Sequence, residues 1–189
     1  MIRDLISKNR SYRRFYEELD ITRETLKELV DLGRLSASAK NFQPLKYVLS
    51  CDRRKNSLIF PYLVWARFLT DWPGPGEGER PSAYIVILGD TEISRFWDYD
   101  AGIAAQSILL GATEKGLGGC MIANIDRQGL RKALKIPPRY EILLVLALGK
   151  PKEKVVIETV GPDGNTKYWR DGKGVHHVPK RPLDEVIIG

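Results

Sequence analysis

The chain has 189 residues, of which 43% are hydrophobic and 29% are charged, so its composition is that of an ordinary globular protein and excludes wholesale disorder. A chain of this length accommodates one domain, here residues 1–189, and buries enough surface to fold without disulfides or a structural metal. Thirty basic and twenty-four acidic side chains give a net charge of +6, which suits an anionic ligand but does not by itself indicate nucleic acid.

The first half of the chain predicts two helices separated by a short strand. Thr22 is a suitable N-cap for a helix whose leucines recur at helical spacing. Residues 45–51 favour a half-buried strand because they include tyrosine, valine and leucine in succession. A second helical pattern covers residues 56–69 and ends at the Pro- and Gly-rich stretch 72–78, which cannot be regular structure.

The second half of the chain predicts two strands buried on both faces and one long helix. Residues 83–88 and 142–148 are continuous apolar runs, as in strands with no solvent-exposed face. Residues 98–116 predict the principal helix, whose many small side chains allow neighbouring backbones to approach closely in the core or at a subunit interface. Shorter elements are expected as a strand at 118–122, a helix at 126–134, a loop or hairpin at 161–174 and an edge strand at 185–188. Because helices and strands do not alternate strictly, the sequence favours an α+β fold.

The sequence contains neither the dinucleotide-binding fingerprint nor a P-loop, and it contains no motif for an activated side-chain nucleophile. The glycine-rich residues 116–119 follow a helix and precede a strand, which reverses the dinucleotide-binding order and predicts a helix C-cap. The only histidines, His176 and His177, are neighbours whose side chains point to opposite sides of an extended chain, so we assign them surface or packing roles. No serine or cysteine has a histidine arrangement that would activate it. If the chain is an enzyme, a cofactor is expected to supply the chemistry.

The cysteines and the N-terminus indicate in which cellular compartment the protein is expected. Cys51 and Cys120 are far apart and form no CxxC pair, as expected in a reducing cytosol. The N-terminus lacks the apolar run of a signal peptide, and no stretch reaches about 18 uninterrupted apolar residues. We therefore expect a cytoplasmic protein without a membrane span.

Basic residues gather near both ends of the chain. Arg10, Arg13 and Arg14 lie near the start, and Lys180 and Arg181 lie near the end. From charge alone, these residues either belong to a solvated surface or converge on one phosphate group, for which lysine and arginine supply charge-assisted donors.

Four segments occur in an order that is shared with one enzyme family. Residues 9–15 contain Asn-Arg-Ser-Tyr-Arg, and residues 38–44 read Ser-Ala-Lys-Asn-Phe-Gln-Pro. Residues 102–122 join a small-residue helix to a short strand, and residues 179–186 form a basic C-terminal segment. These segments resemble the Arg-Arg-Ser-x-Arg motif, the Pro-Ser-x-x-Asn-x-Gln-Pro loop, the central helix with its flavin-facing strand, and the basic C-terminus of the nitroreductase family of flavin enzymes. The resemblance covers nearly the whole chain, with asparagine in place of the first arginine.

The resemblance implies an α+β three-layer sandwich, with a central, mainly antiparallel sheet flanked by helices, that binds FMN at the interface of an intertwined homodimer. The FMN phosphate, ribityl chain and pyrimidine edge would be bound by Arg10, Ser11 and Arg13. Lys180 and Arg181 would reach the phosphate from the other end of the chain. The ribityl chain and isoalloxazine edge would be lined by Ser38, Asn41 and Gln43. The ring near N5 and O4 would lie against the backbone of Met121, Ile122, Ala123 and Asn124.

The implied activity is an oxidoreductase reaction in two halves. NADH or NADPH would pass a hydride to flavin N5, and a nitroaromatic, quinone or similar acceptor would then take the electrons. Arg13 would stabilise negative charge at the N1 and O2 edge of the ring. A flavin-binding sensor or store with little turnover would use the same residues and stays open at this point. Nucleic-acid binding rests on the +6 charge alone, since no basic stripe with interleaved aromatic residues is present.

The aromatic residues of the stretch 61–72 permit two interpretations. Tyr62, Trp65, Phe68 and Trp72 form either part of a packed amphipathic helix, which the sequence favours, or an aromatic wall or lid over the substrate face. In the second case, changing Trp65 or Trp72 would alter substrate preference and leave the flavin content intact.

Overall fold

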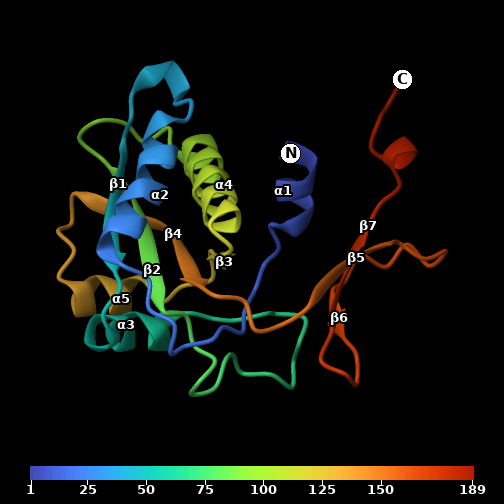
Figure 1. Ribbon diagram of the computed structural model, residues 1–189. Helices are drawn as coiled ribbons and strands as arrows, with labels where there is room; N and C mark the ends of the chain where they lie inside the picture. The colour runs from blue at the N-terminus through green and yellow to red at the C-terminus, as the bar shows by residue number, and fades with distance from the viewer.

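Two helical layers enclose a four-stranded antiparallel sheet in the computed structural model, which describes residues 1–189 (Figure 1). The strand order is β1-β2-β4-β3, with β1 at Leu45–Ser50, β2 at Ala83–Asp90, β4 at Tyr140–Gly149 and β3 at Gly118–Ile122. All neighbouring strands pair antiparallel. The two strands expected to be buried on both faces are therefore the central ones, and β1 and β3 form the edges.

A hydrophobic layer covers each face of the sheet. α2 (Arg23–Leu35) and α4 (Asp98–Glu114) pack on one face, and α3 (Arg53–Ile59) and α5 (Arg127–Leu134) pack on the other (Figure 1). Every residue of β2 is buried, because its odd-numbered side chains enter the first layer and its even-numbered side chains enter the second. This arrangement confirms the expected α+β three-layer sandwich, and it explains why the central strands are apolar without alternation.

Side-chain caps fix where three of the helices begin. The N-cap residues of α2, α3 and α5, respectively Thr22, Asp52 and Asp126, each accept a hydrogen bond from a backbone N–H of the first turn at 2.8 to 3.1 Å. α4 ends shortly before Gly116, whose φ of +70° is the left-handed conformation that glycine adopts beyond helix C-termini. These caps confirm the helix start expected at Thr22 and the capping role expected for residues 116–119. No helix in the structure combines the length and the apolar character that a membrane span requires.

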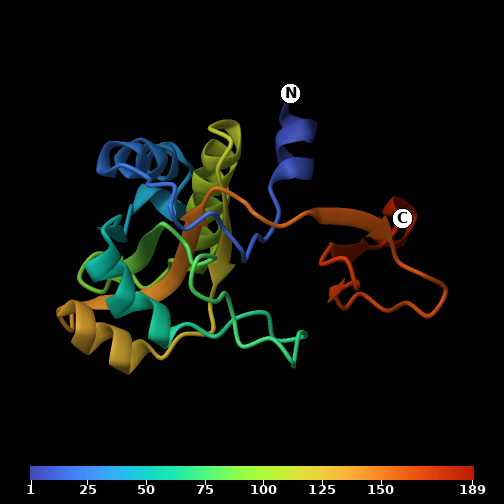
Figure 2. The ribbon, with the colours of Figure 1, turned by 60° about the horizontal axis from the view of Figure 1, so that its bottom comes forward.

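The residues after β4, 150–189, form what we call the C-terminal arm, which extends away from the sandwich (Figure 2). The arm contains a separate sheet of order β5-β7-β6, with β5 at Val155–Thr159, β7 at His176–Lys180 and β6 at Trp169–Arg170. β5 and β7 pair parallel, and β6 pairs antiparallel with β7.

The N-terminal segment connects the sandwich with this arm. α1, at Ile2–Lys8, lies beside α4, and the chain then passes along β3, where Ser11 forms a parallel bridge with Gly119. The fully buried Phe15 forms an antiparallel bridge with Pro151 at the start of the arm. The two ends of the chain therefore run side by side where the arm leaves the body.

The helix expected at residues 56–69 is wrong. α3 ends at Ile59, a 3-10 turn (η2) follows at Phe60–Tyr62, and the chain beyond it is irregular. Pro61 cannot donate a helical hydrogen bond, and Leu63 turns to an extended conformation to bridge Ile125. The amphipathic-helix interpretation of the aromatic stretch is therefore wrong as well.

The C-terminus also differs from expectation. The edge strand expected at 185–188 is wrong, because Leu183–Glu185 form a 3-10 turn (η3) after Pro182 and the chain beyond is irregular. The expected loop at 161–174 contains the two-residue strand β6. No pattern in the sequence indicates α1, β5 or β7, since these short elements mix polar and apolar side chains without a clear period.

Candidate functional site

A basic cavity of about 300 Å³ lies where the N-terminal segment meets the C-terminal arm. Its lining comes from the residues that follow α1 and from the arm: Asn9, Arg10, Ser11, Arg13, Tyr168, His176, Val178 and Lys180. Arg10, Arg13 and Lys180 bring three cations to the cavity, and its lining includes no carboxylate. The cavity therefore attracts an anion, and the basic residues near the two ends of the chain do converge.

Arg13 is the least exposed of these cations, at 8%. Its guanidinium lies 3.4 Å from Nε2 of His176 and 4.8 Å above the ring of Tyr168. The backbone N–H of Arg13 donates to Glu153, whose buried carboxylate also accepts from Arg170 at 3.0 Å. Arg13 is thus fixed by groups of the C-terminal arm, which reduces the conformational entropy that binding a ligand would cost.

A smaller and mostly apolar cavity of about 170 Å³ adjoins the basic one. The two cavities share Arg13 and Tyr168. The rest of the lining comes from β3 with the loop after it and from the chain after η2: Cys120, Met121, Ile122, Ala123, Asn124, Val64, Trp65 and Ala66. Nε1 of Trp65 is buried without a hydrogen-bond partner. Burial raises the pKa of the Cys120 thiol, so this group stays protonated and is no nucleophile.

The other basic residues near the termini differ in the contacts that they make within the chain. Arg10 donates to a backbone carbonyl of α1 at 2.6 Å, while its Nε is buried without a partner, and burial lowers the pKa of its guanidinium. Lys180 lines the basic cavity. Arg181 instead lies 3.3 Å from Glu185 and outside the cavity lining, and Arg14 forms two hydrogen bonds with a glutamate before β2. Arg10 and Lys180 are therefore better placed for a ligand than Arg14 and Arg181.

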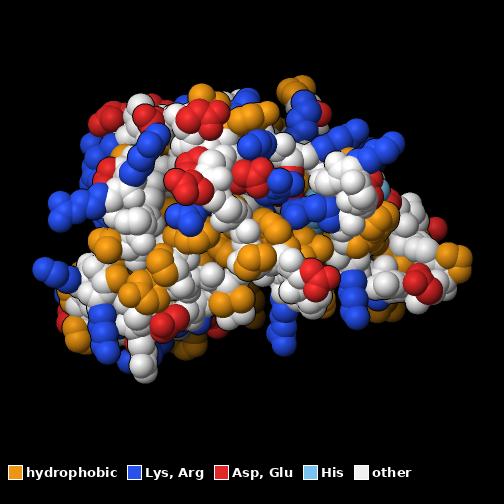
Figure 3. All heavy atoms as spheres, turned by 90° about the horizontal axis from the view of Figure 1, so that it is seen from below, with side chains coloured by type: hydrophobic (Ala, Val, Ile, Leu, Met, Phe, Trp, Pro, Cys, Tyr) orange, Lys and Arg blue, Asp and Glu red, His pale blue; other side chains and the backbone are white.

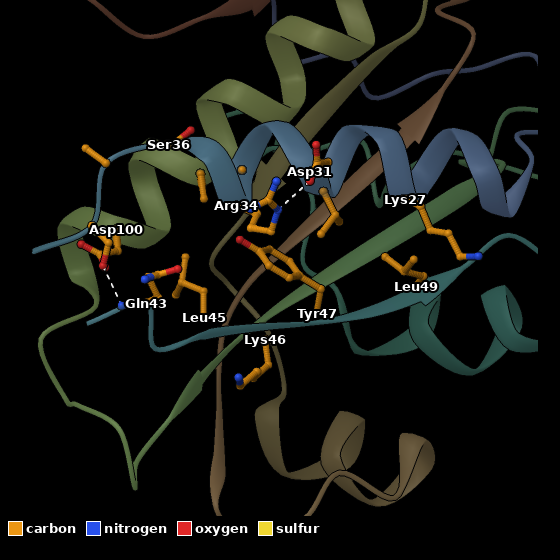
Figure 4. Close-up of a pocket in the computed structure, with 15 residues that line it drawn as sticks. Lys27, Asp31, Arg34, Ser36, Gln43, Leu45, Lys46, Tyr47, Leu49 and Asp100 are labelled. Carbon is orange, nitrogen blue, oxygen red and sulfur yellow. Dashed lines mark hydrogen bonds and ion pairs between the residues drawn. The ribbon is translucent and has the colours of Figure 1, made fainter. Parts of the chain in front are cut away.

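The loop expected at the flavin lies elsewhere in the single chain. Ser38 and Gln43 line a separate cavity of about 490 Å³ between α2 and β1, which shares no residue with the two cavities above (Figure 4). The hydroxyl of Ser38 donates to Asp100 in the first turn of α4, and it accepts from the N–H of Gln43 at 2.9 Å. The sequence-based site residues thus fall into two spatial groups.

The backbone of this loop is unusual. Lys40, Asn41 and Gln43 have φ values of 51°, 56° and 53°, a left-handed conformation that costs energy in residues other than glycine. The side chains of Asn41 and Gln43 are exposed. A costly conformation that leaves amide groups accessible is typical of a binding loop.

His176 lines the basic cavity, whereas the sequence predicts only a surface or packing role for it. It is 1% exposed on β7, so it does not lie at the surface, and burial together with nearby positive charge, including Arg13, lowers its pKa to about 4. His177 faces the other way, stacks on Trp169 at 4.0 Å between ring centroids and lies 3.0 Å from Glu158. Strand alternation predicts that the two rings diverge, but β7 and its contact with Arg13 left no signal in the sequence.

The aromatic residues after η2 line the apolar cavity at one position and contact the C-terminal arm at two others. Trp65 is buried and lines the apolar cavity. Phe68 packs edge-on against Tyr168 at 5.1 Å, and Trp72 lies under an arginine of β6 at 4.7 Å. Phe68 is 51% exposed, and Figure 3 shows hydrophobic side chains gathered across the face seen from below. These contacts join the aromatic segment to the C-terminal arm.

Comparisons with known proteins agree with this architecture. The crystal structure of a nitroreductase family protein from Streptococcus pneumoniae TIGR4 matches with a TM-score of 0.71 over 100% of both chains at 16% identity, which shows the fold. An FMN-dependent nitroreductase from Clostridium difficile R20291 matches with a TM-score of 0.64 at 27% identity, covering 82% of this chain and 89% of that one. A protein of Archaeoglobus fulgidus, provisionally named NADH dehydrogenase/NAD(P)H nitroreductase, is 26% identical over 149 residues, which are 75% of this chain and 80% of that protein.

The fold is the α+β sandwich of nitroreductase-type proteins. The sequence model of the Nitroreductase family matches residues 6–80 and 78–150, which together form most of the chain. The chain belongs to the nitroreductase family. This confirms the resemblance seen in the sequence and the expected class of enzyme.

Proposed function

We propose that this protein is an FMN-dependent oxidoreductase that uses NADH or NADPH to reduce a nitroaromatic, quinone or similar acceptor. The observation that carries the proposal is the basic cavity, to which both ends of the chain contribute cations and which adjoins an apolar cavity. FMN fits this combination, because its phosphate is anionic and the two faces of its planar ring are largely apolar. The names of the relatives, an FMN-dependent nitroreductase and an NAD(P)H nitroreductase, support the proposal.

The donors of the basic cavity fit a phosphate. Arg10, Arg13 and Lys180 would supply charge-assisted hydrogen bonds, and Asn9 and Ser11 would supply neutral ones. The buried Nε of Arg10 has no partner within the chain. An unsatisfied buried donor in a cationic cavity is the state expected of a group that a ligand completes.

The apolar cavity fits the ring of the cofactor. Trp65 lines one side of it, and Met121 and Ala123 lie on or just after β3. β3 is an edge strand, so the backbone groups on its outer side have no strand partner beyond the bridge at Gly119. Free N–H groups at this edge would bond the ring near N5 and O4, and the unpartnered indole N–H of Trp65 is a further donor.

The chain's own contribution to the reaction is binding, orientation and charge. Bound FMN would supply the hydride chemistry between the nicotinamide and the acceptor. Arg13 would place a fixed positive charge where negative charge develops on the pyrimidine edge. The apolar lining would exclude water from the ring. A protonated Cys120 fits this scheme, because no side-chain nucleophile is needed.

A second copy of the chain would complete the site. Ser38, Asn41 and Gln43 lie apart from both cavities in one chain, although their motif resembles a flavin-binding loop. An intertwined homodimer would bring the loop of one chain to the cavities of its partner. Phe96, just before α4, and Tyr99, in its first turn, are 75% and 84% exposed, so they offer apolar surface that such a contact would cover.

Steady-state oxidation of NADH and NADPH, with a quinone and a nitroaromatic as acceptors, tests the proposal. We expect many turnovers per FMN, and we expect Arg13→Ala to lower the rate strongly. Lys173→Ala is the matched control, because Lys173 is an exposed cation of the arm outside the cavity lining. Oxidation that stops after one equivalent per flavin would identify a sensor or store instead, and failure to bind FMN would contradict the proposal.

A further inference from the structure

His176 and Arg13 come from opposite ends of the chain and meet at the basic cavity. Nε2 of His176 lies 3.4 Å from a guanidinium nitrogen of Arg13. Because a guanidinium has donors only, Nε2 is the acceptor, and the ring proton therefore lies on Nδ1. Burial and adjacent positive charge lower the pKa of His176 to about 4, so the ring is uncharged at neutral pH. His176 is thus a neutral acceptor for Arg13.

We propose that His176 is a positioning residue for Arg13, whose guanidinium it holds in the orientation that binds FMN. This inference rests on the proposed function, because that function assigns Arg13 to the cofactor. The other groups around the guanidinium are the carbonyl of Ser11 at 3.2 Å, the ring face of Tyr168 and the thiol of Cys120. A thiol sulfur is only a weak acceptor, so His176 supplies the stronger directional side-chain contact.

Packing alone does not account for a histidine at this place. Nδ1 of His176 is buried without a hydrogen-bond partner, and an unsatisfied buried donor destabilises a folded chain. An apolar ring of similar size would fill the same space beside Tyr168, whose centroid lies 5.2 Å away, and would avoid that cost. The histidine differs from such a ring by the acceptor that it offers to Arg13.

His177 provides a matched control on the same strand. Its ring stacks on Trp169 and lies near Glu158, and it makes no contact with Arg13. A change at His177 therefore disturbs the C-terminal arm while it leaves the acceptor of Arg13 in place.

The test is a double-mutant cycle on the dissociation constant of FMN, measured from the flavin released when the loaded protein is diluted. We expect His176→Phe to weaken FMN binding about five- to tenfold. We also expect it to lower the reduction potential of the bound flavin, because the charge of Arg13 is less well oriented. His176→Gln, whose amide oxygen can replace Nε2, should keep most of both properties, and His177→Phe should stay near wild type. When Arg13 is already alanine, adding His176→Phe should raise the dissociation constant of FMN by less than about a further twofold, because the effect of His176 depends on Arg13.

Three results would overturn the positioning role and leave the proposed function standing: unchanged FMN binding in His176→Phe, equal losses in His176→Gln and His176→Phe, or full additivity with Arg13→Ala. His176→Leu is a second variant without an acceptor, and the Tm of each variant identifies any that fails to fold. If only histidine and glutamine allow folding at this position, the residue is structural and the proposal is overturned. A wild-type protein that binds no FMN would overturn the proposed function and this inference together.

Discussion

The hydroxyl of Ser38 donates a hydrogen bond to Asp100 at 2.6 Å, and this bond ties the loop after α2 to the first turn of α4. The other oxygen of the same carboxylate accepts from the backbone N–H of Ala39 at 2.9 Å. Asp100 is 3% exposed, so its carboxylate is shielded from water and both of its oxygens accept hydrogen bonds from the loop. This contact explains how a loop with several left-handed residues keeps one conformation.

Asp100→Ala should destabilise the protein and weaken FMN binding together. Loss of the carboxylate leaves the Ser38 hydroxyl and a backbone N–H without their partner, which costs about 1–3 kcal/mol in the free energy of unfolding. Denaturant unfolding and FMN titration measure the two effects. Asp98→Ala, an exposed carboxylate of the same helical turn, is the control. Reduced stability with unchanged FMN affinity would show that the loop takes no part in the site.

Lys180→Ala should weaken FMN binding about ten- to a hundredfold, because a charge-assisted hydrogen bond contributes about 1.5–3 kcal/mol. The dependence of affinity on salt should become shallower as well. Arg181→Ala should change little, since that side chain pairs with Glu185 outside the cavity lining. FMN titrations at two ionic strengths check both variants. Equal losses in the two variants would contradict the geometry seen here.

Val64→Trp should change the choice of acceptor without loss of flavin. Val64 lines the apolar cavity and is 53% exposed, so a larger side chain can be accommodated while it narrows access. We expect KM to rise for bulky quinones more than for small nitro compounds, with Tm unchanged. Trp65→Ala is the contrasting variant, because removing a buried Trp costs about 3–5 kcal/mol of stability. Unchanged KM values for all acceptors in Val64→Trp would show that this side of the apolar cavity takes no part in substrate binding.

The two histidines should shift stability in opposite directions with pH. The hydrogen bond that His177 donates to Glu158, helped by Asp171, raises the pKa of His177 above its ordinary value. The stabilisation of the folded state by protonated His177 is fully present below the unfolded pKa of about 6.5, and it is lost as pH rises through the folded pKa. Burial lowers the pKa of His176 to about 4, so stability falls, by up to about 3 kcal/mol, as pH drops from about 6.5 toward 4.

Denaturant unfolding between pH 4 and pH 8 tests this pair of effects. His177→Gln should lose stability relative to wild type near pH 5 and less near pH 8. His176→Phe should become more stable relative to wild type as the pH falls. Parallel pH profiles in all three proteins would contradict the assigned protonation states.

Most of the sandwich could be predicted from the sequence because its signals are local. The apolar runs that became β2 and β4 have no alternation, which requires burial on both faces. Thr22 and Gly116 mark helix ends through their own conformations. The stretch after Ile59 predicts a helix that does not form, since its aromatic residues are close to helical spacing while Pro61 and the bridge at Leu63 end the helix.

The candidate site was only partly predictable because its key contacts join distant parts of the chain. Arg10, Arg13 and Lys180 could be proposed from charge and motif. The contact of Arg13 with His176 depends on the path of the C-terminal arm, and the arm's short strands carry no clear pattern. Likewise, nothing in the sequence shows that Glu153 is buried against the backbone of Arg13.

FMN binding in the cavity formed by the two ends of the chain is tested most directly by visible absorption spectroscopy. The spectrum of the purified protein is recorded during titration with FMN and then with NADPH or NADH. We predict a flavin band that saturates at one FMN per chain and bleaches when the nicotinamide is added, with saturation strongly weakened in Lys180→Ala. A protein that shows no bound flavin at high FMN concentration, or whose flavin band stays unchanged when NADH or NADPH is added, would contradict this proposal.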